Sequence, residues 1–114
     1  MDKINDYQTK IVALLKEYSH QYDAKKYPEL KDEVICDYQN NHFQLITSGW
    51  EEARYRYIIS FHFHIKEDGK VWLLVNNTDV RIAEELVKKG IPRTDIVLGF
   101  QRPMHRQFTD FAAD

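Results

Sequence analysis

Two histidines separated by one residue are the first groups in this sequence that could do chemistry. His62 and His64 lie in a run that alternates between apolar and polar residues, as in a β-strand, so both imidazoles would project from one face. A metal site needs at least a third ligand, which His42 or Asp37 on a neighbouring strand would have to supply. The pattern allows two interpretations: a weak metal site, or two imidazoles that make cross-strand contacts on a polar sheet face.

A basic segment near the C-terminus is the second group of interest. It contains Arg102, His105 and Arg106, and Arg93 lies a short distance upstream. Guanidinium groups bind carboxylates and phosphates alike through paired hydrogen bonds. The segment could therefore dock a protein partner or a nucleic acid, or its arginines could pair with acidic side chains inside the fold. The acidic residues that could form such internal pairs are Glu84, Glu85 and Asp95.

No other arrangement in the sequence predicts catalysis. The serines at positions 19, 48 and 60 lie outside the sharp strand-to-helix turn that exposes a catalytic nucleophile. The four glycines are scattered and form no phosphate-binding loop. The adjacent glutamate pairs at 51–52 and 84–85 are typical of solvated charges rather than of converging carboxylates. We therefore predict a binding protein, not an enzyme, with no cofactor.

The composition restricts the class of protein. The chain has 114 residues, of which 43% are hydrophobic and 30% charged, as expected for one globular domain over residues 1–114. Its formal net charge of -2 disfavours a dedicated DNA-binding domain, because neutralising phosphates supplies most of the affinity of such domains. The polar start does not resemble a signal peptide, and no apolar run is long enough to cross a membrane. A cytoplasmic location is therefore expected.

The elements that position these residues begin with a predicted helix over residues 2–23. Apolar residues recur there at helical spacing, and Asp2 can cap the first turn by accepting hydrogen bonds from backbone N–H groups. Four strands are predicted next, at residues 33–39, 42–50, 54–66 and 71–76. The turns between them include Asn-Asn at 40–41 and Asp-Gly at 68–69, and such short connections predict an antiparallel meander.

The third strand has the clearest alternation. Its odd-numbered residues from Tyr55 to Ile65 are all aromatic or aliphatic, which predicts that they face the core together. The helices are expected to cover this face only. The charged and imidazole side chains predicted for the other face are Arg54, Arg56, His62, His64 and Lys66.

A second helix is predicted after the fourth strand, with Thr78 as its N-cap and Gly90 as its C-terminal stop. One further helical turn is predicted over residues 94–98. The predicted fold class is α+β: a four-stranded antiparallel meander sheet with an N-terminal helix and a second helix packed on one face. The aromatic residues expected to anchor the C-terminal segment are Phe100, Phe108 and Phe111.

A series of motifs runs through the second half of the chain. The motifs are D-G-K-V-W at 68–72, N-N-T at 76–78, I-A-E-E-L-V at 82–87 and G-I-P-R-T-D-I-V-L-G-F at 90–100. Their order and spacing resemble the XisI family, the fdxN element excision controlling factor proteins of cyanobacteria. The opening helix and the Gly-Trp pair at 49–50 also resemble that family, so the resemblance covers nearly the whole chain.

The resemblance implies a regulatory role. XisI proteins are linked to excision of a DNA element by site-specific recombination during heterocyst differentiation, and they are encoded beside a companion, XisH. The expected function is that of a non-catalytic controlling factor that acts through a XisH-like partner. Two alternatives stay open, namely direct DNA binding through the basic C-terminal segment and a metal-dependent hydrolase that uses His62 and His64. A homo-oligomer is compatible with the sequence. The residues predicted to bind the partner are Arg93, Arg102, His105 and Arg106.

Overall fold

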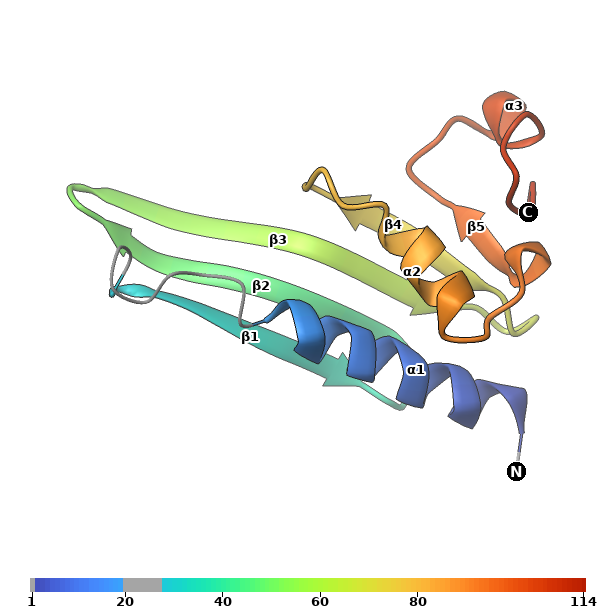
Figure 1. Ribbon diagram of the computed structural model, residues 1–114, viewed down its shortest axis with the longest axis horizontal. Coiled ribbons are helices and arrows are strands. Elements are labelled where there is room, and N and C mark those ends of the chain that lie inside the picture. Colours follow the sequence, from blue (N-terminus) through green and yellow to red (C-terminus); the bar gives the residue numbers. More distant parts are fainter. Residues whose placement is uncertain (1, 20–27) are drawn as a thin grey trace.

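The computed structural model describes residues 2–19 and 28–114, which form an α+β fold built on one sheet (Figure 1). No helix among these residues is long and apolar enough to span a membrane. The helical elements are α1 (Lys3–Tyr18), α2 (Ile82–Lys88), the 3-10 helix η1 (Arg93–Asp95) and α3 (Pro103–Arg106). The strands are β1 (Leu30–Asp37), β2 (His42–Glu51), β3 (Arg54–Ile65), β4 (Val71–Asn76) and β5 (Ile96–Leu98).

The sheet has five strands in the order β1-β2-β3-β4-β5, one more than predicted. Strands β1 to β4 form the predicted antiparallel meander, whereas β5 pairs parallel to β4, so the sheet is mixed. The predicted helical turn is wrong beyond η1, because the next residues form β5, in which Ile96 and Val97 are fully buried. The parallel direction follows from the connection, since α2 carries the chain back along the sheet before β5 begins (Figure 1).

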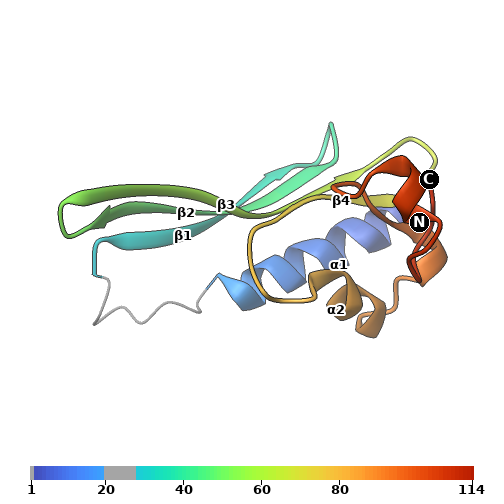
Figure 2. The same ribbon diagram turned by 90° about the horizontal axis from the view of Figure 1, so that it is seen from above.

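The helices α1 and α2 lie on the same face of the sheet, as predicted (Figure 2). α1 contributes Ile11, Leu14 and Leu15 to the core, and α2 contributes Ile82 and Leu86. Burying a side chain of this size stabilises a fold by about 1.5–3 kcal/mol, so this layer of contacts between helices and sheet is the main source of stability. The three largest fully buried side chains, all from the sheet, are Phe43, Phe61 and Phe63.

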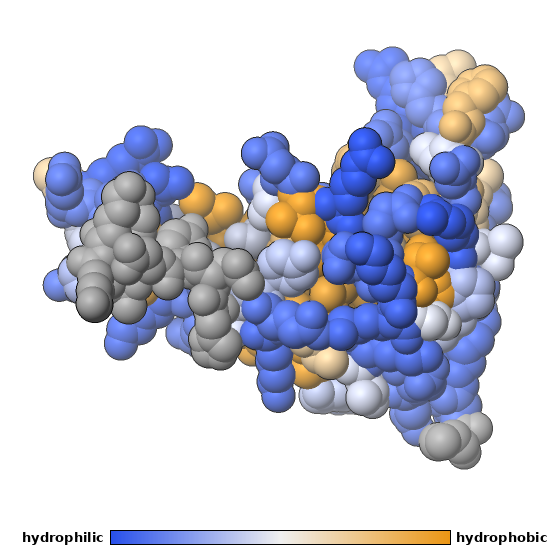
Figure 3. Space-filling view, viewed as in Figure 1, coloured by the Kyte–Doolittle hydropathy of each residue, from blue (hydrophilic) through white to orange (hydrophobic). Residues whose placement is uncertain are grey.

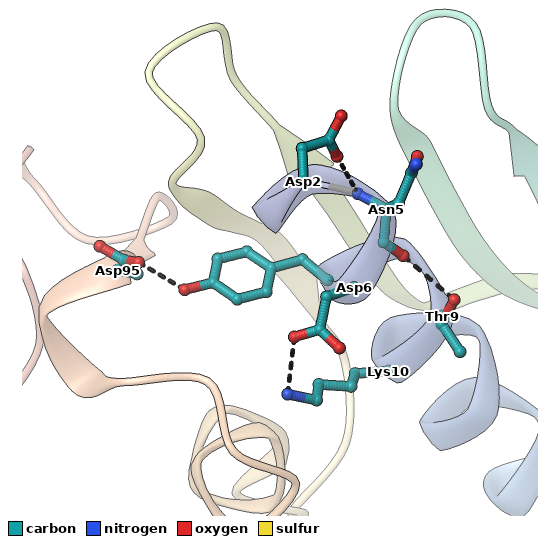
Figure 4. Close-up of polar contacts among 7 residues, drawn as sticks. Asp2, Asn5, Asp6, Thr9, Lys10 and Asp95 are labelled. Atoms are coloured by element: carbon teal, nitrogen blue, oxygen red, sulfur yellow. Dashed lines mark hydrogen bonds and ion pairs between the residues drawn. The ribbon is translucent and has the colours of Figure 1, made fainter.

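The start of α1 is fixed by side-chain hydrogen bonds (Figure 4). Asp2 is the N-cap, as predicted, and its Oδ1 accepts a hydrogen bond from the backbone N–H of Asn5 at 2.8 Å. The Tyr7 hydroxyl donates to the Asp95 carboxylate at 2.5 Å, which ties α1 to η1. Residues 20–23 of the predicted helix lie outside the described part of the chain.

α2 begins later than predicted and ends where predicted. Thr78 is not its N-cap, because the Thr78 Oγ1 accepts a hydrogen bond from the backbone N–H of Val80 at 3.0 Å and so closes a separate turn before the helix. At the other end Gly90 has a φ of 106°, and the backbone N–H of Ile91 donates to the Leu86 carbonyl at 3.2 Å. Glycine adopts this left-handed backbone without steric cost, so it ends the helix.

A β-bulge divides β3 into two halves that face opposite ways. Leu45 of β2 pairs with Phe61, but the next residue, Ile46, pairs with Ile59, so Ser60 is an extra residue on β3. Such an insertion inverts the alternation of side chains on one side of the bulge. The predicted face of every β3 residue before Ser60 is therefore wrong.

Four side chains show the consequence. Tyr55 and Tyr57 were predicted to face the core, but they lie on the face away from the helices and are 55% and 62% exposed. Arg54 and Arg56 lie on the face opposite to the two histidines of β3, although the uninterrupted alternation placed all of them together. The polar face predicted from the sequence is therefore not a single surface.

Candidate partner-binding surface

The C-terminal tail, residues 99–114, is a loop held to the sheet at both ends. The backbone N–H of Gly99 donates to the Leu73 carbonyl at 2.8 Å, beside β4. The backbone N–H of Ala112 donates to the Ile96 carbonyl at 2.8 Å, beside β5. The tail is therefore part of the folded structure, and α3 lies within the loop (Figure 1).

The large apolar residues of the tail divide between core and surface. Phe111 packs against the core, as predicted. The prediction that Phe100 and Phe108 also anchor the tail is wrong, because they are 50% and 81% exposed, and Met104 is 63% exposed. Figure 3 shows hydrophobic side chains at the molecular surface in the region of α3. Clustered apolar side chains in contact with water are typical of interaction sites.

Arg106, one of the predicted partner-binding residues, makes contacts inside the fold. Its Nε donates to the Gln101 carbonyl at 3.1 Å, and its Nη2 donates to the Gly99 carbonyl at 3.3 Å. Its Cζ lies 4.8 Å from the centroid of the Trp72 ring, and the Nζ of Lys66 lies 3.6 Å from the same centroid. Arg106 therefore holds the tail against β4.

Arg93, the second predicted residue, also pairs within the fold. Its two terminal nitrogens donate to the two carboxylate oxygens of Glu84 at 2.7 and 2.6 Å, which joins η1 to α2. These hydrogen bonds hold the pKa of Glu84 below its usual value. The Arg93 Cζ also lies 5.3 Å from the centroid of the Phe111 ring. For Arg93, internal pairing is the interpretation that the structure supports.

Arg102 and His105, the remaining two, are exposed beside the apolar side chains of the tail. Phenylalanine, methionine and arginine are enriched in protein–protein interfaces, where a few such residues carry most of the binding energy. The spacing of the aromatic residues indicates an ordered tail, but it contains no signal for which of them reach solvent. We use the name tail surface for Phe100, Arg102, Met104, His105 and Phe108.

Three histidines meet on the sheet face away from the helices. His42 faces His64 across β2 and β3, and their rings stack in parallel with 3.9 Å between centroids. The Nδ1 of His42 lies 2.9 Å from the Nε2 of His62, so one of these rings donates to the other. The Nδ1 of His64 donates to the Asn41 carbonyl at 3.0 Å. Burial lowers the pKa of both His42 and His62, and charge on the neighbouring imidazoles lowers it further.

This histidine cluster does not suit a shared metal ion. Ring nitrogens bind a metal in the plane of the ring, and two parallel stacked rings direct their lone pairs along separate planes. Residues 2–19 and 28–114 contain no group of three or more histidine, cysteine, aspartate or glutamate side chains that could hold a metal. The contacts of His62 and His64 are those of the second interpretation, cross-strand packing. The antiparallel pairing of the second and third strands was the signal that could have placed His42 beside them.

Comparison with known proteins gives consistent matches over nearly the whole chain. The family profile described as XisI protein matches residues 1–113. The fold is similar to a crystal structure of a XisI-like protein from Anabaena variabilis, at 40% identity and a TM-score of 0.86, covering 96% of this chain and 97% of that one. It is also similar to the fdxN element excision controlling factor XisI from Anabaena variabilis, at 30% identity and a TM-score of 0.81, covering 99% and 100%. None of the curated proteins compared with the chain matches it.

Proposed function

The chain belongs to the XisI family, and from this premise we propose that it is a non-catalytic controlling factor for excision of a DNA element. It acts by binding a XisH-like protein through the tail surface. The observation that carries the proposal is the exposure of Phe100, Met104 and Phe108 on a tail that is itself fixed to the sheet. A fixed apolar surface loses little conformational entropy when a partner covers it.

The charges of the tail surface favour a protein partner over DNA. Arg93 and Arg106 are engaged within the fold, which leaves Arg102 and His105 as the basic side chains of this surface. One or two cations give little affinity for a phosphate backbone, whereas one arginine beside exposed aromatic residues is a common centre of a protein interface. The chain as a whole has a formal net charge of -2, which also disfavours DNA.

Co-expression with the XisH-like partner tests the proposal directly. A tag on the partner should retain this protein on an affinity column, and the two should elute together in size-exclusion chromatography. Phe108→Ser should weaken the complex at least about tenfold, because the side chain is 81% exposed and its loss removes apolar contact area. Arg102→Glu should do the same through charge reversal.

A matched control separates the surface from general charge effects. Lys16→Glu reverses an exposed cation on α1 and should leave the complex unchanged. Circular dichroism should show that all three variants are folded. The proposal fails if the wild-type proteins do not associate, or if folded Phe108→Ser and Arg102→Glu proteins bind as tightly as wild type.

A further inference from the structure

Exposed apolar side chains also gather at the other end of the molecule, on the sheet face that α1 and α2 leave uncovered (Figure 2). Trp50, Tyr55 and Tyr57 belong to the part of β2 and β3 that extends farthest from the tail (Figure 1), whereas Ile35 pairs with Gln44 and lies nearer the histidine cluster on the same face. The strand register places them on one face, because Ile46 pairs with Ile59 and Trp50 pairs with Tyr55. We call this surface the arm face, and its members are Ile35, Trp50, Tyr55, Tyr57 and Ile59.

The arm face is large enough to contribute to a stable interface. Ile35, Trp50, Tyr55 and Tyr57 are 45%, 52%, 55% and 62% exposed. Since an aromatic side chain carries roughly 150–250 Å² of surface, the three aromatic residues alone present on the order of 350 Å² to solvent, and Ile35 adds to this area. That is about half of the roughly 800 Å² that each partner buries in a stable complex. The rings of Trp50 and Tyr55 already pack together, with 5.3 Å between centroids, so they form a pre-ordered anchor.

The charges beside these residues are self-complementary. Lys31 pairs with Ser48 and Glu33 pairs with Ile46, so both side chains lie on the same face as the arm face and border it along β1. A partner with excess charge of one sign would be attracted by one of these two side chains and repelled by the other. A twofold axis satisfies both, because in such an interface each residue meets its counterpart in exchange.

We propose that a second copy of this chain docks face to face on the arm face, about a twofold axis that sets Lys31 of each copy against Glu33 of the other. The aromatic residues of the arm face and the tail surface lie at opposite ends of the molecule, so the dimer leaves the tail surface free (Figure 1). The dimer does not depend on the proposed function, and either can fail without the other.

Sedimentation velocity of the full chain over roughly 1–100 µM, the range that reports a micromolar Kd, tests the dimer. The wild-type protein should form a dimer, and Tyr57→Glu should be a monomer over the whole range. Lys31→Glu and Glu33→Lys should each raise the dimer Kd by about tenfold, since each sets like charges together. The double variant Lys31→Glu/Glu33→Lys should return the Kd to near its wild-type value, because it restores opposite charges.

Phe108→Glu is the matched control, since Phe108 is the most exposed phenylalanine of the tail surface and lies outside the arm face. It should leave the dimer intact while weakening the complex with the XisH-like partner. A wild-type protein that stays monomeric at the highest concentration overturns the proposal. A folded Tyr57→Glu protein that dimerises like wild type also overturns the proposal. So does a charge-swapped double variant whose dimer Kd is as high as that of the single variants.

Discussion

The guanidinium of Arg106 lies over the indole ring of Trp72, with 4.8 Å between its Cζ and the ring centroid. Trp72 belongs to β4 and Arg106 to α3, so this contact joins the tail to the sheet. A cation in this position contributes about 0.5–1 kcal/mol at an exposed site and about 2 kcal/mol when it is desolvated. Arg106 therefore stabilises the fold, a role that its place in a basic segment did not predict.

Replacing Arg106 by alanine should loosen the tail. The change removes the contact with Trp72 and two hydrogen bonds to backbone carbonyls, so the free energy of unfolding should fall by about 1–3 kcal/mol. Urea unfolding measures this change, and the tryptophan emission of the folded protein should change as well. Arg102→Ala is the control, and it should alter the free energy by less than about 0.5 kcal/mol because its side chain is exposed. Equal losses of the free energy of unfolding in the two variants would contradict the role of Arg106 in holding the tail to the sheet.

The hydrogen bond from Tyr7 to Asp95 gives a second prediction. Burial raises the pKa of Asp95, but the hydrogen bonds from Tyr7 and Lys3 outweigh it, so this pKa lies below its usual value. Tyr7→Phe should therefore raise the pKa of Asp95 and lower the free energy of unfolding at neutral pH by about 1 kcal/mol. NMR titration of the carboxylate and urea unfolding measure the two effects. Tyr57→Phe removes a hydroxyl from an exposed ring and should change neither quantity.

The features that the sequence predicted correctly depend on local backbone chemistry. Asp2 caps α1 because a carboxylate can reach the free N–H groups of the first turn. Asn41 and Gly69 have φ angles of 61° and 85° at the two predicted turns, and Gly90 ends α2. Each of these features depends on one or two neighbouring residues, so the residue types along the chain were enough to predict it.

The features that were missed depend on residues far apart in the chain. The bulge at Ser60 is fixed by the loop after β4, where the backbone N–H of Asn77 donates to the Ser60 carbonyl at 3.0 Å and its side-chain amide to the Ile59 carbonyl at 2.9 Å. β5 is short and becomes a strand only because β4 offers it a free edge. The local sequence pattern of β3 does not indicate the bulge, and that of residues 96–98 does not indicate a strand.

Only part of the candidate site could be predicted from the sequence, because its other features also depend on residues far apart in the chain. The composition indicates the basic segment, and the sequence allows the pairing of Arg93 with Glu84 as one of two alternatives. The exposed or buried state of Phe100, Phe108 and Phe111 depends on the path of the tail over the sheet, which spacing along the chain does not determine.

The bulge gives a third prediction, because it separates Tyr57 from Phe61 although both have odd numbers. Phe61 is 1% exposed, so Phe61→Ala should lower the free energy of unfolding by about 3–5 kcal/mol. Tyr57→Ala should lower it by less than about 1 kcal/mol in dilute protein, where copies of the chain are separated. Urea unfolding of the two variants side by side is the measurement. Similar large losses in both would mean that the alternation runs through β3 without a bulge.

The histidine cluster gives the last prediction. Because the pKa values of His42 and His62 are lowered in the fold, the unfolded chain, with histidine pKa values of about 6.5, binds more protons. The free energy of unfolding should therefore have its highest value above about pH 6.5. It should fall as the pH drops from there toward the lowered pKa values of the two histidines. His62→Gln should flatten this dependence between about pH 7.5 and 5, whereas His105→Gln, at an exposed position on α3, should keep it. Thermal unfolding midpoints across this range measure the slope, and a His62→Gln slope equal to that of wild type would show that acid acts elsewhere in the fold.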